Sequence, residues 1–264
     1  MKFIISDNNQ KGYLMSNESL KKSIEKFGKW MYKFELAEDV STPLISEEFQ
    51  KVHDTRKKMI FSKLDNIIKR WDNLRCLDIA CNEGFYSFEL AKKGIKEVIG
   101  FDAREINIDK ANFIKKFMKV ENTSFFVEDV EKINDELGDF DLVFVLGLLY
   151  HVENPMLILR KIRSLTKGIC IIDTQVNRYD SNVDLGFGCT GFDKQTKDII
   201  AIIKENDIEE NITASITGLS FIPNKSGLFT MLREVGFTEL EQIEPFPNSY
   251  EQYATHDRII IIAK

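Results

Sequence analysis

The 264-residue chain contains no long apolar run. Its longest apolar segments, such as 142–149, are far shorter than the roughly 18 residues that a membrane-spanning helix requires. The amino terminus reaches Asp7 too early to hold the apolar stretch of a secretory signal. We therefore expect a soluble, cytoplasmic protein with no membrane partner.

The chain also has little cysteine. Cys76, Cys81, Cys170 and Cys189 form no C-x-x-C pair. Two of them lie in apolar, strand-like runs, where cysteine behaves as a small hydrophobe. This spacing argues against a disulfide framework or a zinc site, and we expect no metal. Internal repeats and low-complexity tracts are missing too, so the length predicts one large domain or a domain with a small lobe.

Charge is unevenly spread. The net charge is −6, but residues 1–70 hold 14 Lys and Arg against 10 Asp and Glu, and the remainder holds 22 against 32. An acidic body argues against a protein that must grip many phosphates, and so against a nucleic-acid partner. The basic leader contains Lys21, Lys22, Lys26, Lys29 and Lys33, which could attract an anionic substrate or simply form a solvated helix face.

From residue 74 the sequence alternates between strand and helix patterns. Short apolar strands are expected at 75–80, 98–101, 124–127, 141–146 and 169–172, with helices at 85–93, 110–120 and 155–165. Asn154 and Pro155 predict the start of the third helix, and Gly168 its end. A helix at 226–235 and strands at 239–243 and 258–263 follow. The alternation predicts a parallel α/β sheet with helices on both faces.

Two segments lie outside this pattern. Residues 1–73 form a mostly helical N-terminal cap segment in our interpretation, ahead of a main domain at 74–264. Residues 177–223 form an insertion after the fifth strand and include the Gly-rich stretch 185–191. Ligands of open α/β sheets bind beyond the carboxyl ends of the strands, so both segments could cover a pocket there.

The first strand ends in a loop that leads into a helix, Asp78-Ile79-Ala80-Cys81-Asn82-Glu83-Gly84. This segment resembles the D-x-G-x-G-x-G loop of class I methyltransferases, with Ala80 and Asn82 in place of two glycines. Alanine is a small change, and Asn tolerates left-handed backbone better than other non-glycine residues. An ordinary strand–helix turn is the alternative.

Carboxylates follow the next two strands. Asp102 ends the second strand, where a carboxylate can accept hydrogen bonds from both ribose hydroxyls of a nucleotide. Ala103 and Arg104 come next and could pack near the ribose and adenine. Asp129 follows the third strand, between Glu128 and Val130, and in class I methyltransferases this position binds the adenine amino group. Capping of the next helix is the alternative for each Asp.

The segment Gly147-Leu148-Leu149-Tyr150-His151-Val152-Glu153-Asn154-Pro155 is the most specific of the chain. It resembles G-x-L-Y-H-x-x-x-P of a class I group that includes the tRNA wobble-uridine carboxymethyltransferases and many small-molecule enzymes. Segments 30–36, 83–89 and 222–237 extend the resemblance. It implies a Rossmann-like, doubly wound sheet of seven mostly parallel strands with a closing antiparallel strand. It also implies S-adenosylmethionine as cofactor, held by Asp78, Ala80, Cys81, Asn82, Gly84, Phe85, Asp102, Ala103, Arg104, Glu128, Asp129, Val130, Gly147 and Leu148.

Methyl transfer requires that a nucleophile be held in line with the methyl group and lose any proton. His151 is a candidate general base because imidazole titrates near neutrality. A structural role below the loop is the alternative. Tyr150 fits an orienting group better than a base, and His53 and His256 belong to no motif.

Three functions remain open at this point. The first is an O- or N-methyltransferase of a small polar metabolite, for which a sugar or phosphate-bearing molecule would fit, acting as a monomer or homodimer. The second is a tRNA-modifying methyl- or carboxymethyltransferase. The latter chemistry needs a cation for the donor's extra carboxylate, which the sequence does not assign. The third is a cofactor-binding protein without catalysis.

Overall fold

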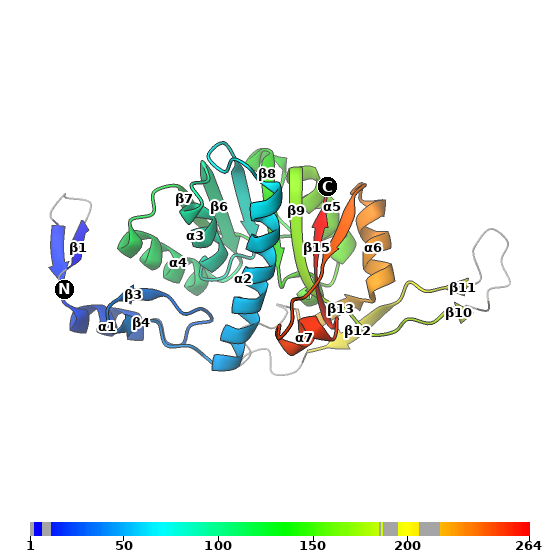
Figure 1. Ribbon diagram of the computed structural model, residues 1–264, viewed down its shortest axis with the longest axis horizontal. Helices are drawn as coiled ribbons and strands as arrows, with labels where there is room; N and C mark the ends of the chain where they lie inside the picture. Colours follow the sequence, from blue (N-terminus) through cyan, green and yellow to red (C-terminus); the bar gives the residue numbers. More distant parts are fainter. Residues whose placement is uncertain (1–2, 7–11, 185, 187–194, 206–216) are drawn as a thin grey trace. The chain divides into compact units, whose positions relative to one another are not determined.

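The computed structural model describes residues 3–6, 12–184, 186, 195–205 and 217–264. These residues form two compact units, 1–130 and 131–264 (Figure 1). This division does not test the boundary expected at 73/74, which stays a prediction. The Gly-rich stretch 185–191 lies outside the described residues, apart from Gly186.

Unit 1 contains three parallel strands, β5 (Arg75–Ile79), β6 (Glu97–Asp102) and β7 (Thr123–Val127). Helices α3 (Phe85–Lys92) and α4 (Glu105–Met118) connect them and pack on them. All three strands were expected, and the parallel pairing brings their carboxyl ends to one edge. Helix α4 begins five residues before the predicted start at 110, and its first turn alternates polar residues with two isoleucines.

The N-terminal part of unit 1 is less helical than expected. It contains helices α1 (Asn17–Glu25) and α2 (Glu47–Ile67), and also two antiparallel pairs, β1 (Phe3–Ser6) with β2 (Gly12–Met15) and β3 (Glu35–Ala37) with β4 (Val40–Ser41). Such strands of two to four residues are too short to show an alternating pattern in the sequence. Trp30 is fully buried, and its backbone pairs with Leu44.

Unit 2 contains the parallel strands β8 (Phe140–Leu146) and β9 (Thr166–Gln175), with β15 (Arg258–Ala263) antiparallel to β9 and β14 (Leu240–Ile243) antiparallel to β15. Hydrogen bonding gives a seven-stranded sheet in the order β14-β15-β9-β8-β5-β6-β7. The predicted Rossmann-like sheet with a reversed strand near its end is therefore confirmed.

Helices α5 (Pro155–Leu165) and α6 (Lys225–Glu234) lie against each other in unit 2, and α5 packs on β8 and β9 (Figure 1). The Asn154 side chain accepts from Leu157 N at 3.2 Å, which is the expected cap. The expected role of Gly168 is wrong. The helix ends at Leu165, and Gly168 lies inside β9, where a Cβ atom would come 2.4 Å from the Asp141 carbonyl oxygen.

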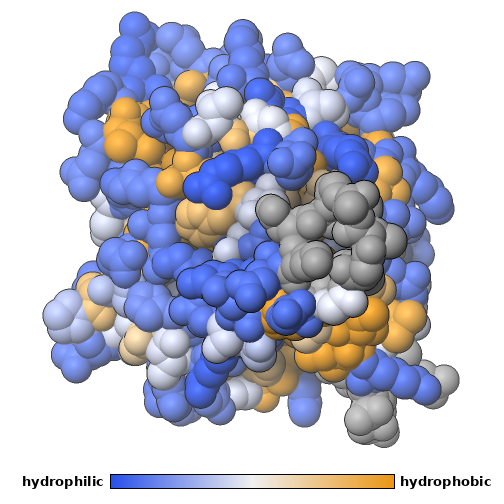
Figure 2. Space-filling model, turned by 90° about the vertical axis from the view of Figure 1, so that its right-hand side faces the viewer, coloured by the Kyte–Doolittle hydropathy of each residue, from blue (hydrophilic) through white to orange (hydrophobic). Residues whose placement is uncertain are grey.

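The insertion forms two antiparallel strand pairs, β10 (Val183–Asp184) with β11 (Gln195–Thr196) and β12 (Ile200–Lys204) with β13 (Leu219–Pro223). Strand β12 exposes several apolar side chains, with Ile202 at 66%. Figure 2 shows one face of the molecule, on which hydrophilic residues predominate and apolar surface gathers in places. The described part of the chain holds no helix long and apolar enough to span a membrane.

Phe125 of β7 fills the space beside two glycines. A Cβ atom at Gly84 would lie 2.8 Å from Cζ of Phe125, and one at Gly100 would lie 2.9 Å from the same ring. Contacts this short do not occur between real side chains, so the ring and the two glycines depend on one another. Gly84 is the N-cap residue of α3, so this packing fixes the start of the helix beside the loop 78–84.

Candidate active site

The loop 78–84 joins β5 to α3 and has an unusual backbone. Ala80, Asn82 and Gly84 have φ angles of 54°, 51° and 77°. These are the three glycine positions of the D-x-G-x-G-x-G pattern, and the left-handed backbone persists at two of them without glycine. Left-handed backbone disfavours residues other than Gly, with Asn the least affected. The substitutions at 80 and 82 therefore leave the turn intact.

The carboxylate of Asp102 connects this loop to α4. Oδ2 accepts from Asn82 N at 3.0 Å, and Oδ1 accepts from Arg104 N at 2.9 Å and from the Asn107 side chain at 3.0 Å. Burial raises the pKa of Asp102, and these hydrogen bonds oppose the rise. A carboxylate has about four acceptor positions, so roughly one remains for a ligand hydroxyl. Asp102 thus serves the loop and the first turn of α4, and its contact with a ribose stays a prediction.

Asp78 lies beneath the loop. Its side chain is buried, and Oδ2 accepts a hydrogen bond of 2.6 Å from the Ser87 hydroxyl on α3. Burial raises the pKa of Asp78 to about 7, although Ser87 lowers it. Cys81 is also buried, and its N–H donates to Phe101 O at 2.9 Å. Both residues thus tie the loop to its surroundings in unit 1.

The other predicted cofactor residues of unit 1 lie at the same edge of the strands. Glu128 N donates to Asp102 O at 3.1 Å, and Asp129 N donates to the Glu128 side chain at 2.9 Å. Ala103 is exposed and Arg104 half-buried, whereas Val130 and Phe85 are buried. The structure thus brings the ends of β5, β6 and β7 together as the spacing predicted.

Glu83 gives the loop a second connection, which sequence reasoning missed. Its buried carboxylate accepts from Met31 N and Tyr32 N at 3.0 Å and from Lys110 Nζ at 2.8 Å. Lys110 Nζ also donates to Lys29 O at 2.6 Å. Burial raises the pKa of Glu83, and Lys110 lowers it. One buried ion pair thus fixes segment 29–34 to the loop.

In unit 2, β8 runs into Gly147, whose φ is 84° and whose N–H donates to Asp173 O at 2.9 Å. Leu148 follows, and a single 3₁₀ turn, η2 (Leu149–His151), presents the next side chains. His151 N donates to Leu148 O at 2.8 Å. The rings of Tyr150 and His151 lie 4.0 Å apart. The motif Gly147 to His151 is therefore one compact turn.

A buried ion pair lies behind Tyr150. Arg258 Nη1 donates to Asp173 Oδ1 at 2.6 Å, and Nη2 donates to the Tyr150 hydroxyl at 3.0 Å. Tyr253 donates to the other Asp173 oxygen at 2.7 Å. The side chains of Arg258 and Asp173 are 5% and 0% exposed, so the pair depends on these additional hydrogen bonds. The orientation of Tyr150 is thus set by β15 and β9.

His151 contacts a carboxylate from the insertion. Its Nδ1 lies 2.9 Å from Oε1 of Glu205, which follows β12, and the Ser220 hydroxyl of β13 donates to the same oxygen. Glu205 was not predicted, because a lone acid 54 residues away carries no sequence signal. Asp173 and Arg258 did carry a sequence signal, because each is a charged residue in or next to a strongly apolar strand.

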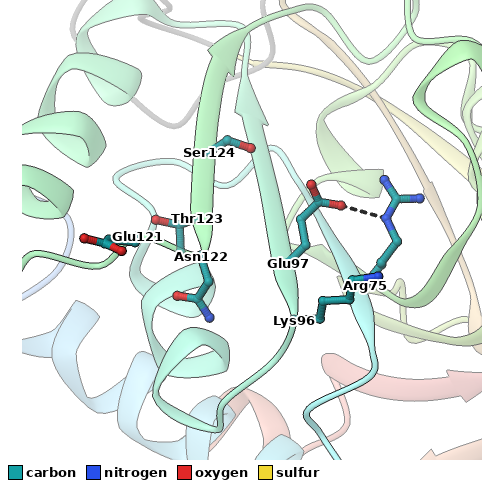
Figure 3. Close-up of a pocket in the computed structure, with 7 residues that line it drawn as sticks. All are labelled: Arg75, Lys96, Glu97, Glu121, Asn122, Thr123 and Ser124. Carbon is teal, nitrogen blue, oxygen red and sulfur yellow. Dashed lines mark hydrogen bonds and ion pairs between the residues drawn. The ribbon is translucent and has the colours of Figure 1, made fainter.

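The other two histidines belong to no predicted site. His53 is buried against Tyr32, and His256 is exposed. Within the described ranges, no group of three or more His, Cys, Asp or Glu could hold a metal ion, and Cys76, Cys81 and Cys170 are buried and form no disulfide there. Cys189 lies outside those ranges. A hollow lined by Arg75, Glu97 and Thr123 opens at the amino ends of β5, β6 and β7, opposite Asp102, and contains none of the predicted residues (Figure 3).

Comparison with known families decides the class of the chain. A family described as a methyltransferase domain matches residues 71–215, more than half of the sequence. The chain belongs to this family. It is a class I S-adenosylmethionine-dependent methyltransferase domain, in agreement with its seven-stranded sheet.

Among relatives of this methyltransferase, a tRNA U34 carboxymethyltransferase of Helicobacter acinonychis (strain Sheeba) is 25% identical over 217 residues, 77% of this chain and 74% of the relative. One from Aliarcobacter butzleri (strain RM4018) is 34% identical over 116 residues, 41% of this chain and 37% of the relative. The crystal structure of the N-terminal domain of EvdMO1 in the presence of SAH and D-fucose has a TM-score of 0.69 and 20% identity. It covers 94% of this chain and 96% of that one, and so shares the fold.

Proposed function

We propose that this methyltransferase binds S-adenosylmethionine through the loop 78–84 and Asp102, and transfers a methyl group to an oxygen or nitrogen atom of a small polar metabolite. The observation that carries the cofactor assignment is the left-handed backbone at 80, 82 and 84, joined to Asp102 through the N–H of Asn82. A turn of this kind exposes backbone for close approach by a ligand, and the carboxylate has an acceptor position left for a ribose hydroxyl.

The other contacts of the cofactor follow from the same edge of unit 1. Asp129, between Glu128 and Val130, is assigned to the adenine, with Ala103 and Arg104 beside the ribose. Gly147 and Leu148 of unit 2 stay predicted cofactor contacts. The bound cofactor supplies a methyl group already activated by the sulfonium charge, so the protein has only to position the acceptor and accept its proton.

His151 is assigned the role of general base, and Tyr150 that of an orienting group. The imidazole of His151 is fixed by a carboxylate through Nδ1, an arrangement found in proton-transferring histidines. The Tyr150 hydroxyl accepts from the permanently charged Arg258, which fixes its position and suits a group that orients the acceptor.

The acceptor class rests on charge and on one structural relative. Residues 71–264 hold ten more acidic than basic side chains, which opposes a phosphate-rich macromolecule. The EvdMO1 domain, which matches this chain along almost its whole length, was crystallised with SAH and D-fucose. A sugar or sugar-linked molecule is therefore the acceptor that we favour, and the basic side chains of the leader would suit one bearing a phosphate.

The alternative is carboxymethyl transfer to tRNA, which the names of the sequence relatives favour. The donor of that reaction carries an extra carboxylate, which needs a cation in the site. Arg258, whose guanidinium is buried beside Tyr150, is the candidate for this cation. Asp173 neutralises this guanidinium, so an added carboxylate would have to compete with a buried counter-ion. We therefore prefer the ordinary donor.

Calorimetric titration with S-adenosylhomocysteine (SAH), S-adenosylmethionine and its carboxylated form tests this proposal. Binding of the ordinary donor at micromolar concentration, with weaker binding of the carboxylated one, is the expected result. No binding at millimolar SAH would refute the cofactor assignment, and preference for the carboxylated donor together with tRNA retention at physiological salt would support the alternative. SAH binding without turnover on any metabolite or tRNA would instead indicate a non-catalytic protein.

A further inference from the structure

The β12–β13 hairpin of the insertion delivers a fixed carboxylate to His151. Glu205 follows β12 directly, and its backbone N–H donates to Gly218 O at 2.8 Å across the hairpin. Ser220, which is 1% exposed, donates its hydroxyl to Glu205 Oε1. The side chains of His151 and Glu205 are only 19% and 16% exposed. The carboxylate is therefore held in place from two sides and partly shielded from water.

The chemistry of the two groups fixes where the imidazole hydrogen lies. An ionised carboxylate can only accept hydrogen bonds, so at 2.9 Å from Oε1 the Nδ1 atom of His151 must carry a hydrogen. In the neutral ring the basic lone pair then belongs to Nε2. When Nε2 takes a proton, the adjacent carboxylate stabilises the cation that forms, as in other histidine–carboxylate pairs.

We propose that Glu205 is the positioning residue that makes His151 a base, and that the acceptor atom is a hydroxyl oxygen. This inference rests on the function proposed above and narrows it. A neutral amine attacks with its own lone pair and can release its proton to water afterwards. An alcohol is a weak nucleophile unless a base removes its proton during attack, and it therefore needs such a pair.

With a hydroxyl acceptor, methyl transfer and loss of the hydroxyl proton occur together. Its oxygen forms the new bond to the methyl carbon as the donor's carbon–sulfur bond breaks, leaving that electron pair on sulfur. The hydroxyl proton passes to Nε2 of His151, and the positive charge moves from the sulfonium to the imidazolium beside Glu205. Water then takes up the proton and regenerates the neutral ring.

The tautomer of His151 can be measured without any ligand. Nitrogen-15 NMR distinguishes a hydrogen on Nδ1 from one on Nε2, and the chain has only three histidines, so His151→Asn assigns the signal. At a pH where the ring is neutral, we expect the Nδ1-protonated form in the wild type and in Glu205→Gln, whose amide oxygen can still accept. Glu205→Ala should shift His151 toward the Nε2-protonated form, which is the intrinsic preference of imidazole.

Glu239→Ala removes an exposed carboxylate of the same unit and is the matched control, with an unchanged His151 signal expected. If the Nδ1-protonated tautomer of His151 persists in Glu205→Ala, the role of Glu205 is overturned, because another group must then hold the imidazole ring. SAH titration of the same variants should show unchanged affinity. If the wild type does not bind SAH at all, the proposed function is refuted, whereas the tautomer result still tests the role of Glu205.

Methyl transfer from labelled S-adenosylmethionine tests the acceptor class. The probes are a panel of neutral hexoses and 6-deoxyhexoses that includes D-fucose, and a matched panel of amino sugars. We expect label in the first panel, falling roughly 100-fold or more in Glu205→Ala with a smaller loss in Glu205→Gln. Label confined to amines, or label in neither panel, would overturn the hydroxyl assignment.

Discussion

The backbone N–H of Asn82 lies 3.0 Å from Oδ2 of Asp102, so a single carboxylate joins the loop after β5 to the end of β6. Its other oxygen serves α4 through Arg104 and Asn107. The carboxylate therefore organises the loop and holds the start of α4, while its predicted contact with a ribose remains to be measured.

Asp102→Asn should weaken SAH binding by about 2 kcal/mol, roughly 30-fold in Kd, because a hydrogen bond to a charged acceptor is lost. The amide oxygen can still accept from Asn82 N, so the loop should keep its backbone. Asp109→Asn changes an exposed carboxylate of the adjoining helix α4 and should leave the Kd unchanged. Isothermal titration measures both, and equal affinity in Asp102→Asn and wild type would place the ribose contact elsewhere.

Gly84→Ala should destabilise unit 1 more than Gly94→Ala does. The two glycines have nearly equal φ angles of 77° and 79°, but a Cβ atom at Gly94 meets nothing within 4 Å, whereas one at Gly84 meets Phe125 at 2.8 Å. Both variants lose about 1 kcal/mol to left-handed backbone, and the clash adds about 1–3 kcal/mol at Gly84. Urea denaturation gives the difference. Equal losses would show that Phe125 yields without cost.

The buried carboxyl of Asp78 should make stability depend on pH. Its folded pKa of about 7 lies above the ordinary value of 3.8 for Asp, so between these values the folded chain keeps a proton that the unfolded chain has released. Stability from this group is therefore greatest near pH 4 and falls as pH rises toward 7. In Asp78→Asn this slope disappears, and the variant gains relative to wild type above pH 7. Thermal unfolding across pH 5–8 checks this, with Asp109→Asn expected to follow the wild type.

Asp173→Asn should unfold unit 2 at markedly lower denaturant concentration. Arg258 would then lie buried without its counter-ion, a loss of about 3–5 kcal/mol for pairs of this kind. Arg178→Gln breaks a second ion pair, with Asp257 just before β15. Because the Arg178 side chain is 75% exposed, the unfolding transition of this variant should shift little. Similar shifts in both variants would mean that the Asp173 pair is worth no more than a surface contact.

The sequence predicted those parts of the fold that depend on local patterns. Strand β15 occupies the predicted range 258–263, and Asn154 followed by Pro155 is enough to predict the helix cap. Gly168 was misread because its reason for being glycine is the carbonyl of Asp141, on the neighbouring strand. A glycine that follows a helix in the sequence predicts a C-terminal helix cap, and only a known contact with another strand would argue otherwise.

The candidate site divides in the same way. Positions 80, 82 and 84, Asp102 and His151 follow from spacing along the chain, because each ends a strand or begins a turn. Glu205 and Glu83 act through partners 54 and 27 residues away, and such pairs have no local signature. Asp173 is marked only as a charge within an apolar strand, and nothing local points to its partner 85 residues away. The residues that hold the site were therefore harder to find than those expected to touch ligands.

Phe125 has a consequence for how related sequences can vary. One ring on β7 takes the room of two side chains, at the N-cap of α3 and in the middle of β6. Positions 84, 100 and 125 therefore share a single volume. A shorter residue at position 125 would relieve the ring contact at position 100, where Cys81 Sγ, 3.0 Å away, would still border an added Cβ atom. Substitutions at 100 and 125 should accordingly be inherited as a pair.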